Sequence, residues 1–153
     1  MDLFTINSWI ILGVIFAIGS GIGMILQITW IMRILIASYI ALCLVLVIPN
    51  DLLFSEYAQI IYFIAIITVF TAVENSRFFD VANWTAGRFS FESISLSILT
   101  VLFMASIICT FTPFGILDFI LTKELYNFFV EYIFYFAIAP LIFTIIFSKR
   151  LHY

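Results

Sequence analysis

The chain has 153 residues, of which 65% are hydrophobic and only 10% are charged. Soluble domains carry about 25% charged residues, so the composition excludes a soluble globular protein and predicts an integral membrane protein. The net charge of −3 comes without a basic patch, which argues against a nucleic-acid partner. We therefore expect an all-α polytopic membrane protein whose residues 1–153 form a single transmembrane domain.

Apolar stretches bounded by charged or turn-forming residues divide the chain into about five predicted transmembrane helices. They lie near residues 9–25, 29–49, 57–73, 93–112 and 127–147. The first two come from one apolar run of roughly 40 residues, about 60 Å of helix, which is enough for two spans and a tight turn. A polar stretch, residues 74–92, predicts an interfacial loop or short surface helix after the third span.

Three glycines stand where the first predicted span ends, at Gly19, Gly21 and Gly23. The chain could turn within this run or just after it, between Gln27 and Trp30. Alternatively, Gly19 and Gly23 form a small-xxx-small pair, which lets two helices approach closely. The sequence leaves both interpretations open.

The C-terminal third contains two further signals. Residues 118–126 are polar and predict a short connection before the fifth span. Pro140 lies in the second half of that span and predicts a kink there, because proline removes one helix hydrogen bond and its ring clashes with the preceding turn.

Ionisable side chains near the bilayer are candidates for a functional site, because a charge in hydrocarbon is costly. Three qualify: Arg33 near the start of the second span, Glu56 before the third, and Glu131 early in the fifth. Each lies within about two turns of a span end, where a long side chain can reach water. Interfacial placement is therefore one interpretation, and a role in moving protons or ions is the other.

Several chemistries lack the residues that they require. His152 is the only histidine, so the sequence predicts no metal or haem site and no Ser-His-Asp triad. Cys43 and Cys109 lie in apolar runs, where free thiols are expected rather than a disulfide. We expect no catalytic residue and no cofactor in this chain. Its expected partners are lipid and the other membrane subunits of a large complex.

The basic residues are distributed unevenly between the two predicted sides of the membrane. One side collects Arg77, Arg88, Lys149 and Arg150. The positive-inside rule then predicts an external N-terminus and a C-terminus in the matrix or cytoplasm. The 19 phenylalanines and few lysines fit a membrane protein from an AT-rich genome. We expect the mitochondrial inner membrane, with the bacterial plasma membrane as the alternative.

The third predicted span carries polar side chains at helical spacing. Gln59, Tyr62 and either Ala65 or Ile66 recur every three to four residues, so they share one helix face. Hydrocarbon offers polar groups no hydrogen-bond partner, so we expect this face to contact other protein.

The same segment, residues 59–70, resembles the third helix of subunit 6 of respiratory NADH:ubiquinone oxidoreductase (complex I). The family pattern is an acid or Gln, a few branched residues, then Tyr-x-Gly-Ala-Ile-x-x-Leu-Phe. Four residues match it: Tyr62, Ala65, Ile66 and Phe70. Ile64 replaces the glycine of a helix that can carry a π-bulge, and the family's acid falls at Gln59 or at Glu56 one turn earlier.

The resemblance implies a subunit of the proton-pumping membrane arm that transmits quinone-site events to proton channels without a redox cofactor. It also implies five spans and an external N-terminus, as the charges do. The candidate residues for a proton path or coupling contact are Arg33, Glu56, Gln59, Tyr62 and Glu131.

Other assignments remain open. Residues 73–81 resemble the Ala-Glu-Thr-Asn-Arg-x-Pro-Phe-Asp-Leu loop of subunit 1 of the same complex. Small bacterial proteins of the colicin V production family also begin with two close spans and a Gly-xxx-Gly like Gly19 and Gly23. A structural helical subunit of another respiratory or ATP-synthase assembly is a further alternative.

Overall fold

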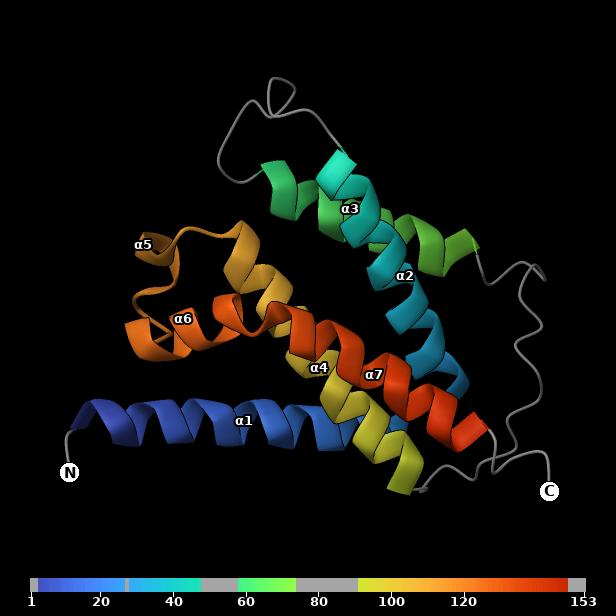
Figure 1. Ribbon diagram of the computed structural model, residues 1–153, viewed down its shortest axis with the longest axis horizontal. Coiled ribbons are helices and arrows are strands. Elements are labelled where there is room, and N and C mark those ends of the chain that lie inside the picture. Colours follow the sequence, from blue (N-terminus) through green and yellow to red (C-terminus); the bar gives the residue numbers. More distant parts are fainter. Residues whose placement is uncertain (1–2, 27, 48–57, 74–90, 149–153) are drawn as a thin grey trace.

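The computed structural model describes residues 3–26, 28–47, 58–73 and 91–148, and every regular element in these ranges is an α-helix. The predicted all-α fold is therefore confirmed. Figure 1 shows the helices crossing one another at steep angles, with α4 running through the middle. The helices are α1 (Leu3–Ile25), α2 (Ile28–Val47), α3 (Ala58–Val73), α4 (Phe91–Phe111), α5 (Phe114–Leu117), α6 (Lys123–Glu131) and α7 (Ile133–Ser148).

Three helices, α1, α2 and α4, are each long and apolar enough to cross a membrane. The 21 residues of α4 extend about 32 Å, which matches a hydrocarbon core of about 30 Å. A fourth span results if α6 and α7 are one broken helix, bent by 57°. The 16 residues of α3 extend only about 24 Å. The described residues thus make a polytopic membrane protein with three or four spans, and the five-span count stays a prediction.

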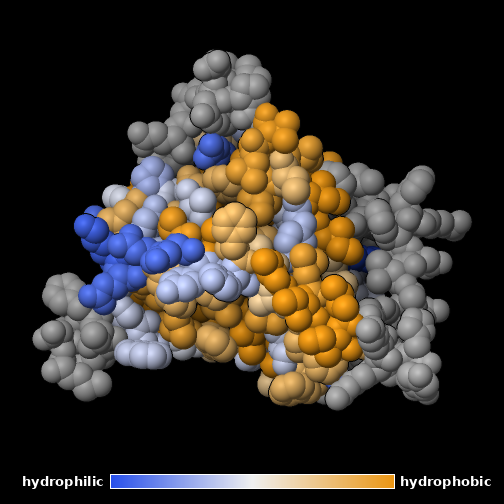
Figure 2. Space-filling model, in the orientation of Figure 1, coloured by the Kyte–Doolittle hydropathy of each residue, from blue (hydrophilic) through white to orange (hydrophobic). Residues whose placement is uncertain are grey.

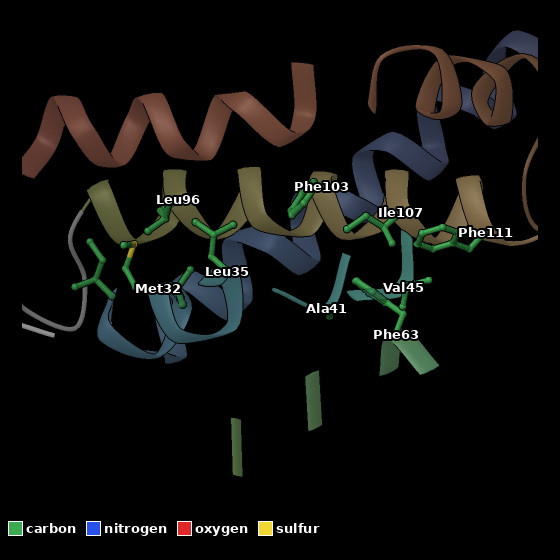
Figure 3. Packing of buried hydrophobic residues seen from close by; sticks show 11 residues of the cluster. Met32, Leu35, Ala41, Val45, Phe63, Leu96, Phe103, Ile107 and Phe111 are labelled. Carbon is green, nitrogen blue, oxygen red and sulfur yellow. The ribbon is translucent and has the colours of Figure 1, made fainter. Parts of the chain in front are cut away.

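The core lies on two sides of α4, which contacts α1, α2, α3, α6 and α7. One cluster joins α4 to α2 and α3, and Figure 3 shows its side chains interdigitating along α4. Its central residues are Ile31, Leu35, Ala41, Phe63, Leu96, Phe103 and Ile107. A second cluster joins α4 to α6, with partly buried side chains of α1 packed against it; its members are Leu102, Cys109, Leu125 and Phe129.

Small hydroxyl side chains allow α4 to occupy this central place. Thr100 Oγ1 donates to the Leu96 carbonyl at 2.8 Å, and Ser106 Oγ donates to the Leu102 carbonyl at 3.0 Å. These bonds satisfy buried hydroxyls within their own helix, so they need no partner on a neighbouring helix. Because serine and threonine are also small, other helices can come close to α4.

The glycine run lies inside α1 rather than at a turn. The helix continues to Ile25 and the next begins at Ile28, so the prediction of a turn within the glycines is wrong. The chain instead turns just after the glycines, which is the other location that the sequence left open. An added Cβ at Gly19 would lie 2.9 Å from the Ile98 Cα, and one at Gly23 would lie 2.6 Å from the Ile94 Cα. The interpretation as a packing pair is therefore confirmed.

The N-terminal end of α4 also supplies a hydrogen bond to the C-terminal end of α1. Ser93 Oγ lies 2.9 Å from the Gly23 carbonyl oxygen and 3.2 Å from that of Leu26, and it donates to this pair. The last carbonyls of a helix lack partners within the helix, so a buried helix end needs such donors. Ser93 therefore supplies a hydrogen bond at the point where the two backbones meet.

The C-terminal third differs from the prediction in two ways. The connection before α6 is shorter than the predicted 118–126, because α6 begins at Lys123 after the N-cap Thr122. A bend that the sequence did not predict lies at Tyr132, between α6 and α7, about two turns before Pro140; α7 continues through Pro140, and the kink there stays a prediction. At Tyr132 the Phe128, Phe129, Tyr132, Tyr135 and Phe136 rings pack on one another with centroids 5.1–5.8 Å apart. This aromatic cluster accompanies the change of helix direction.

Gly23→Ala should lower the free energy of unfolding by about 1–3 kcal/mol, because the new methyl group would overlap the backbone of α4. Gly21→Ala is the matched control, since a Cβ there meets nothing within 4 Å and alanine favours a helix by about 0.5–1 kcal/mol. Unfolding titrations with SDS in mixed micelles measure both. Equal stability of the two variants would contradict the close contact between α1 and α4.

The number of spans decides where the termini lie, because an odd number separates them and an even number does not. Cysteines replacing Asp2 and Tyr153, in a Cys43→Ala background, can be labelled with an impermeant maleimide in sealed vesicles. Five spans predict labelling from opposite sides, with position 2 reacting on the outside. Labelling of both positions from one side would instead leave α3, or the bent pair α6–α7, outside the set of crossing helices.

Candidate functional site

The predicted site residues lie on three different helices. Arg33 is on α2, Gln59 and Tyr62 are on α3, and Glu131 is the last residue of α6. Glu56 lies outside the described residues. In Figure 3, Met32, the neighbour of Arg33, lies at the Leu96 end of α4, whereas Phe63 lies at the Phe111 end. The structure therefore does not bring Arg33 together with Gln59 and Tyr62 into one site.

Arg33 is half-buried in the second turn of α2. Its guanidinium carbon lies 5.1 Å from the centre of the Trp30 ring, which is the geometry of a cation held against an aromatic face. Its Nε is buried and has no hydrogen-bond partner among the described residues. Trp30 thus restrains the cation near the start of α2.

The inner face of α3 is organised by a residue that the sequence analysis did not single out. Phe63 is 2% exposed and lies 6.2 Å from Phe111 of α4, measured between ring centres. Ile66 and Ile67 are half-buried against the same cluster. Because apolar residues stand on every side of α3, its hydrophobic pattern gives no signal for which side faces the core.

The outer face of α3 is left uncovered by the rest of the described chain. Tyr62 is 40% exposed, Ala65 is exposed and Gln59 is half-buried. Of the two residues proposed to share a face with Tyr62, Ala65 lies outward and Ile66 lies inward. The helix is a regular α-helix through Ile64. Among the described residues, the predicted polar face of α3 is therefore left exposed at Tyr62 and partly covered at Gln59.

Glu131 lies where α6 meets the bend. It is exposed, like Lys123 and Glu124 at the start of the helix, whereas Leu125 and Phe129 on the opposite side are buried. A short helix with one charged and one apolar face is typical of a segment lying along the membrane interface. The geometry therefore agrees with the interfacial interpretation of Glu131.

Among residues 3–26, 28–47, 58–73 and 91–148, no three His, Cys, Asp or Glu side chains come close enough to hold a metal ion. Comparison with protein-family models, curated proteins and solved structures finds no match to this chain. The class of protein is thus defined by the fold alone: an all-α polytopic membrane protein whose candidate residues lie on separate surfaces.

Arg33 and Trp30 should be energetically coupled. A double-mutant cycle with Arg33→Gln and Trp30→Leu should give a coupling energy of about 0.5–1 kcal/mol, the size of a partly exposed cation–π contact. Unfolding titrations in micelles supply the four stabilities. Pairing Arg33→Gln with Val47→Ala, at the far end of α2, is the control and should give additive effects. Additivity in the Trp30 cycle as well would show that the ring does not hold the cation.

Proposed function

We propose that this chain is a helical subunit of a larger membrane assembly, with the outer face of α3 as its contact with a neighbouring subunit. The observation that carries the proposal is the exposure of Tyr62 and Ala65 on a helix anchored from the other side by Phe63. A tyrosine hydroxyl or glutamine amide left unpaired in hydrocarbon costs several kcal/mol. A partner helix on this face would supply hydrogen-bond groups to Gln59 and Tyr62.

The assembly that the sequence favours is the membrane arm of a respiratory NADH:ubiquinone oxidoreductase. Support comes from the resemblance of residues 59–70 to the third helix of its subunit 6, where Tyr62 and Ala65 match the family pattern. Of the four matching residues, Tyr62 and Ala65 belong to the uncovered side of α3, whereas Ile66 faces the core. In this proposal the face couples events at the quinone site to proton channels, and Arg33, Glu56 and Glu131 are candidates for the proton path.

In a mild detergent extract, a blue-native gel should show the chain only at the size of a large complex. Tyr62→Phe should weaken assembly by about 0.5–2 kcal/mol, the scale of one hydrogen bond between membrane helices. Tyr135→Phe is the matched control, because it removes the same hydroxyl from an exposed tyrosine on α7. Equal effects of the two substitutions would contradict a special role for the α3 face.

The coupling role has its own readout. Gln59→Leu should lower proton pumping more than NADH oxidation, when both are measured in the same vesicles. Unchanged pumping in Gln59→Leu and Tyr62→Phe would leave α3 as a packing helix.

A second candidate rests on the first two helices. The tight turn after Ile25 and the packing of Gly19 and Gly23 support the resemblance to the colicin V production family. A stable monomer or small homo-oligomer on the native gel would favour this candidate over the respiratory complex.

A further inference from the structure

Two adjoining hollows lie between the first half of α1 and the segment that runs from α5 into α6. The larger, about 550 Å³, carries the polar side chains of Asp118, Thr122, Lys123 and Glu124. The smaller, about 360 Å³, is lined almost entirely by carbon, with Val14, Ile108 and Phe129 among its walls. They share four lining residues: Ile10, Ile11, Ile120 and Leu121. We call the pair the α1–α6 groove.

The polar end of the α1–α6 groove is held in place by a hydrogen bond across it. Ser8 Oγ on α1 lies 2.7 Å from Thr122 Oγ1, the N-cap of α6. Thr122 Oγ1 also accepts from the Leu125 N–H at 3.4 Å. Both hollows have volumes within the range of about 300–1,000 Å³ that is usual for ligand sites. The groove is therefore formed before any ligand enters.

The two ends of the groove lie at different depths in a membrane. The apolar part of α1 begins at Ser8, beside the polar hollow, and the carbon-lined hollow continues along α1 past Val14. The exposed charges of Asp118, Lys123 and Glu124 belong at the level of the lipid headgroups. Figure 2 shows hydrophilic surface gathered over the α5–α6 end and hydrophobic surface over α7. The charged end of the groove, which we call its mouth, therefore lies at the depth of a lipid headgroup. The carbon-lined end, which we call its trough, lies at the depth of an acyl chain.

We propose that the α1–α6 groove binds one phospholipid with an ethanolamine headgroup. The mouth carries charges of both signs, as this headgroup does. The Lys123 ammonium suits the phosphate, and the carboxylates of Asp118 and Glu124 suit a primary ammonium with three N–H donors. Two carboxylates against one ammonium disfavour a lipid whose headgroup is only negative. One acyl chain would lie in the trough between Val14 and Ile108.

Selectivity should depend on the headgroup rather than on the acyl chain. Hydrocarbon around the protein is as apolar as the trough, so moving a chain into it gains little beyond closer packing. The mouth of the groove offers charge-assisted hydrogen bonds that a lipid in the surrounding bilayer does not form with the protein. Choline has no N–H donor and would rely on contact with aromatic rings such as Phe119. This inference is independent of the assembly to which the chain belongs.

Native mass spectrometry of the full chain, released from micelles containing equal amounts of phosphatidylethanolamine, phosphatidylcholine and phosphatidylglycerol, tests the proposal. Phosphatidylethanolamine should be retained about tenfold more than either competitor, the effect of one charge-assisted hydrogen bond. Lys123→Gln should remove most of this preference. Val14→Trp and Ile108→Trp, which fill the trough from opposite walls, should each reduce retention of all three lipids.

Ile64→Trp is the control, because it enlarges an exposed residue on α3, away from the groove, and should leave lipid retention unchanged. Circular dichroism checks that every variant keeps its helix content. Equal retention of the three lipids by the unaltered chain would overturn the headgroup assignment. Retention that neither tryptophan in the trough reduces would overturn the groove as the site.

Discussion

The contact between α1 and α4 is the constraint on which the rest of the structure depends. Gly19 and Gly23 leave no room for even a methyl group between the two backbones. Ser93 adds a hydrogen bond to the Gly23 carbonyl at the same place. Helices in a bilayer gain nothing from hiding apolar surface, so close packing and hydrogen bonds must hold them together. This contact supplies both, and it fixes α4 against the first helix of the chain.

Once α4 is placed, its remaining faces organise the other helices. Tyr39 of α2 stacks on Phe103 at a centroid distance of 4.8 Å, and its hydroxyl donates to the Ala137 carbonyl of α7. One tyrosine thus links three helices through its ring and its polar tip. On the opposite side, Phe129 of α6 is fully buried in the second cluster. The α1–α6 groove exists because α4 holds α1 and α6 on neighbouring faces.

The two surfaces that we assign to partners differ in physical character. The outer face of α3 presents a tyrosine hydroxyl and an amide from a helix whose other side is anchored by Phe63. Such a face suits another helix. The α1–α6 groove is concave, with charges at one end and carbon along the other. That shape suits a molecule with a charged head and one flexible chain, so protein and lipid contacts occupy separate places.

The sequence by itself determined the all-α membrane fold and the approximate position of each helix, because uncharged apolar runs and their polar boundaries are local properties. It could not choose between a turn and a packing surface at Gly19 and Gly23, since only the position of α4 decides that. It predicted a kink at Pro140 but not the change of direction at Tyr132, which lies within a cluster of aromatic rings. Four of the five predicted site residues are divided among three helices, and the fifth, Glu56, lies outside the described residues.

Only the tertiary structure decided which side of α3 faces inward and where the groove lies. Apolar residues stand on every side of α3, so the inward side is fixed only when a specific partner, here Phe111, contacts Phe63. The groove is built from α1, from the C-terminal half of α4 and from residues that follow α4, so its walls lie far apart along the chain. Neither segment alone carries a recognisable site. Their proximity depends on helix packing, which is a property of the whole chain rather than of any local pattern.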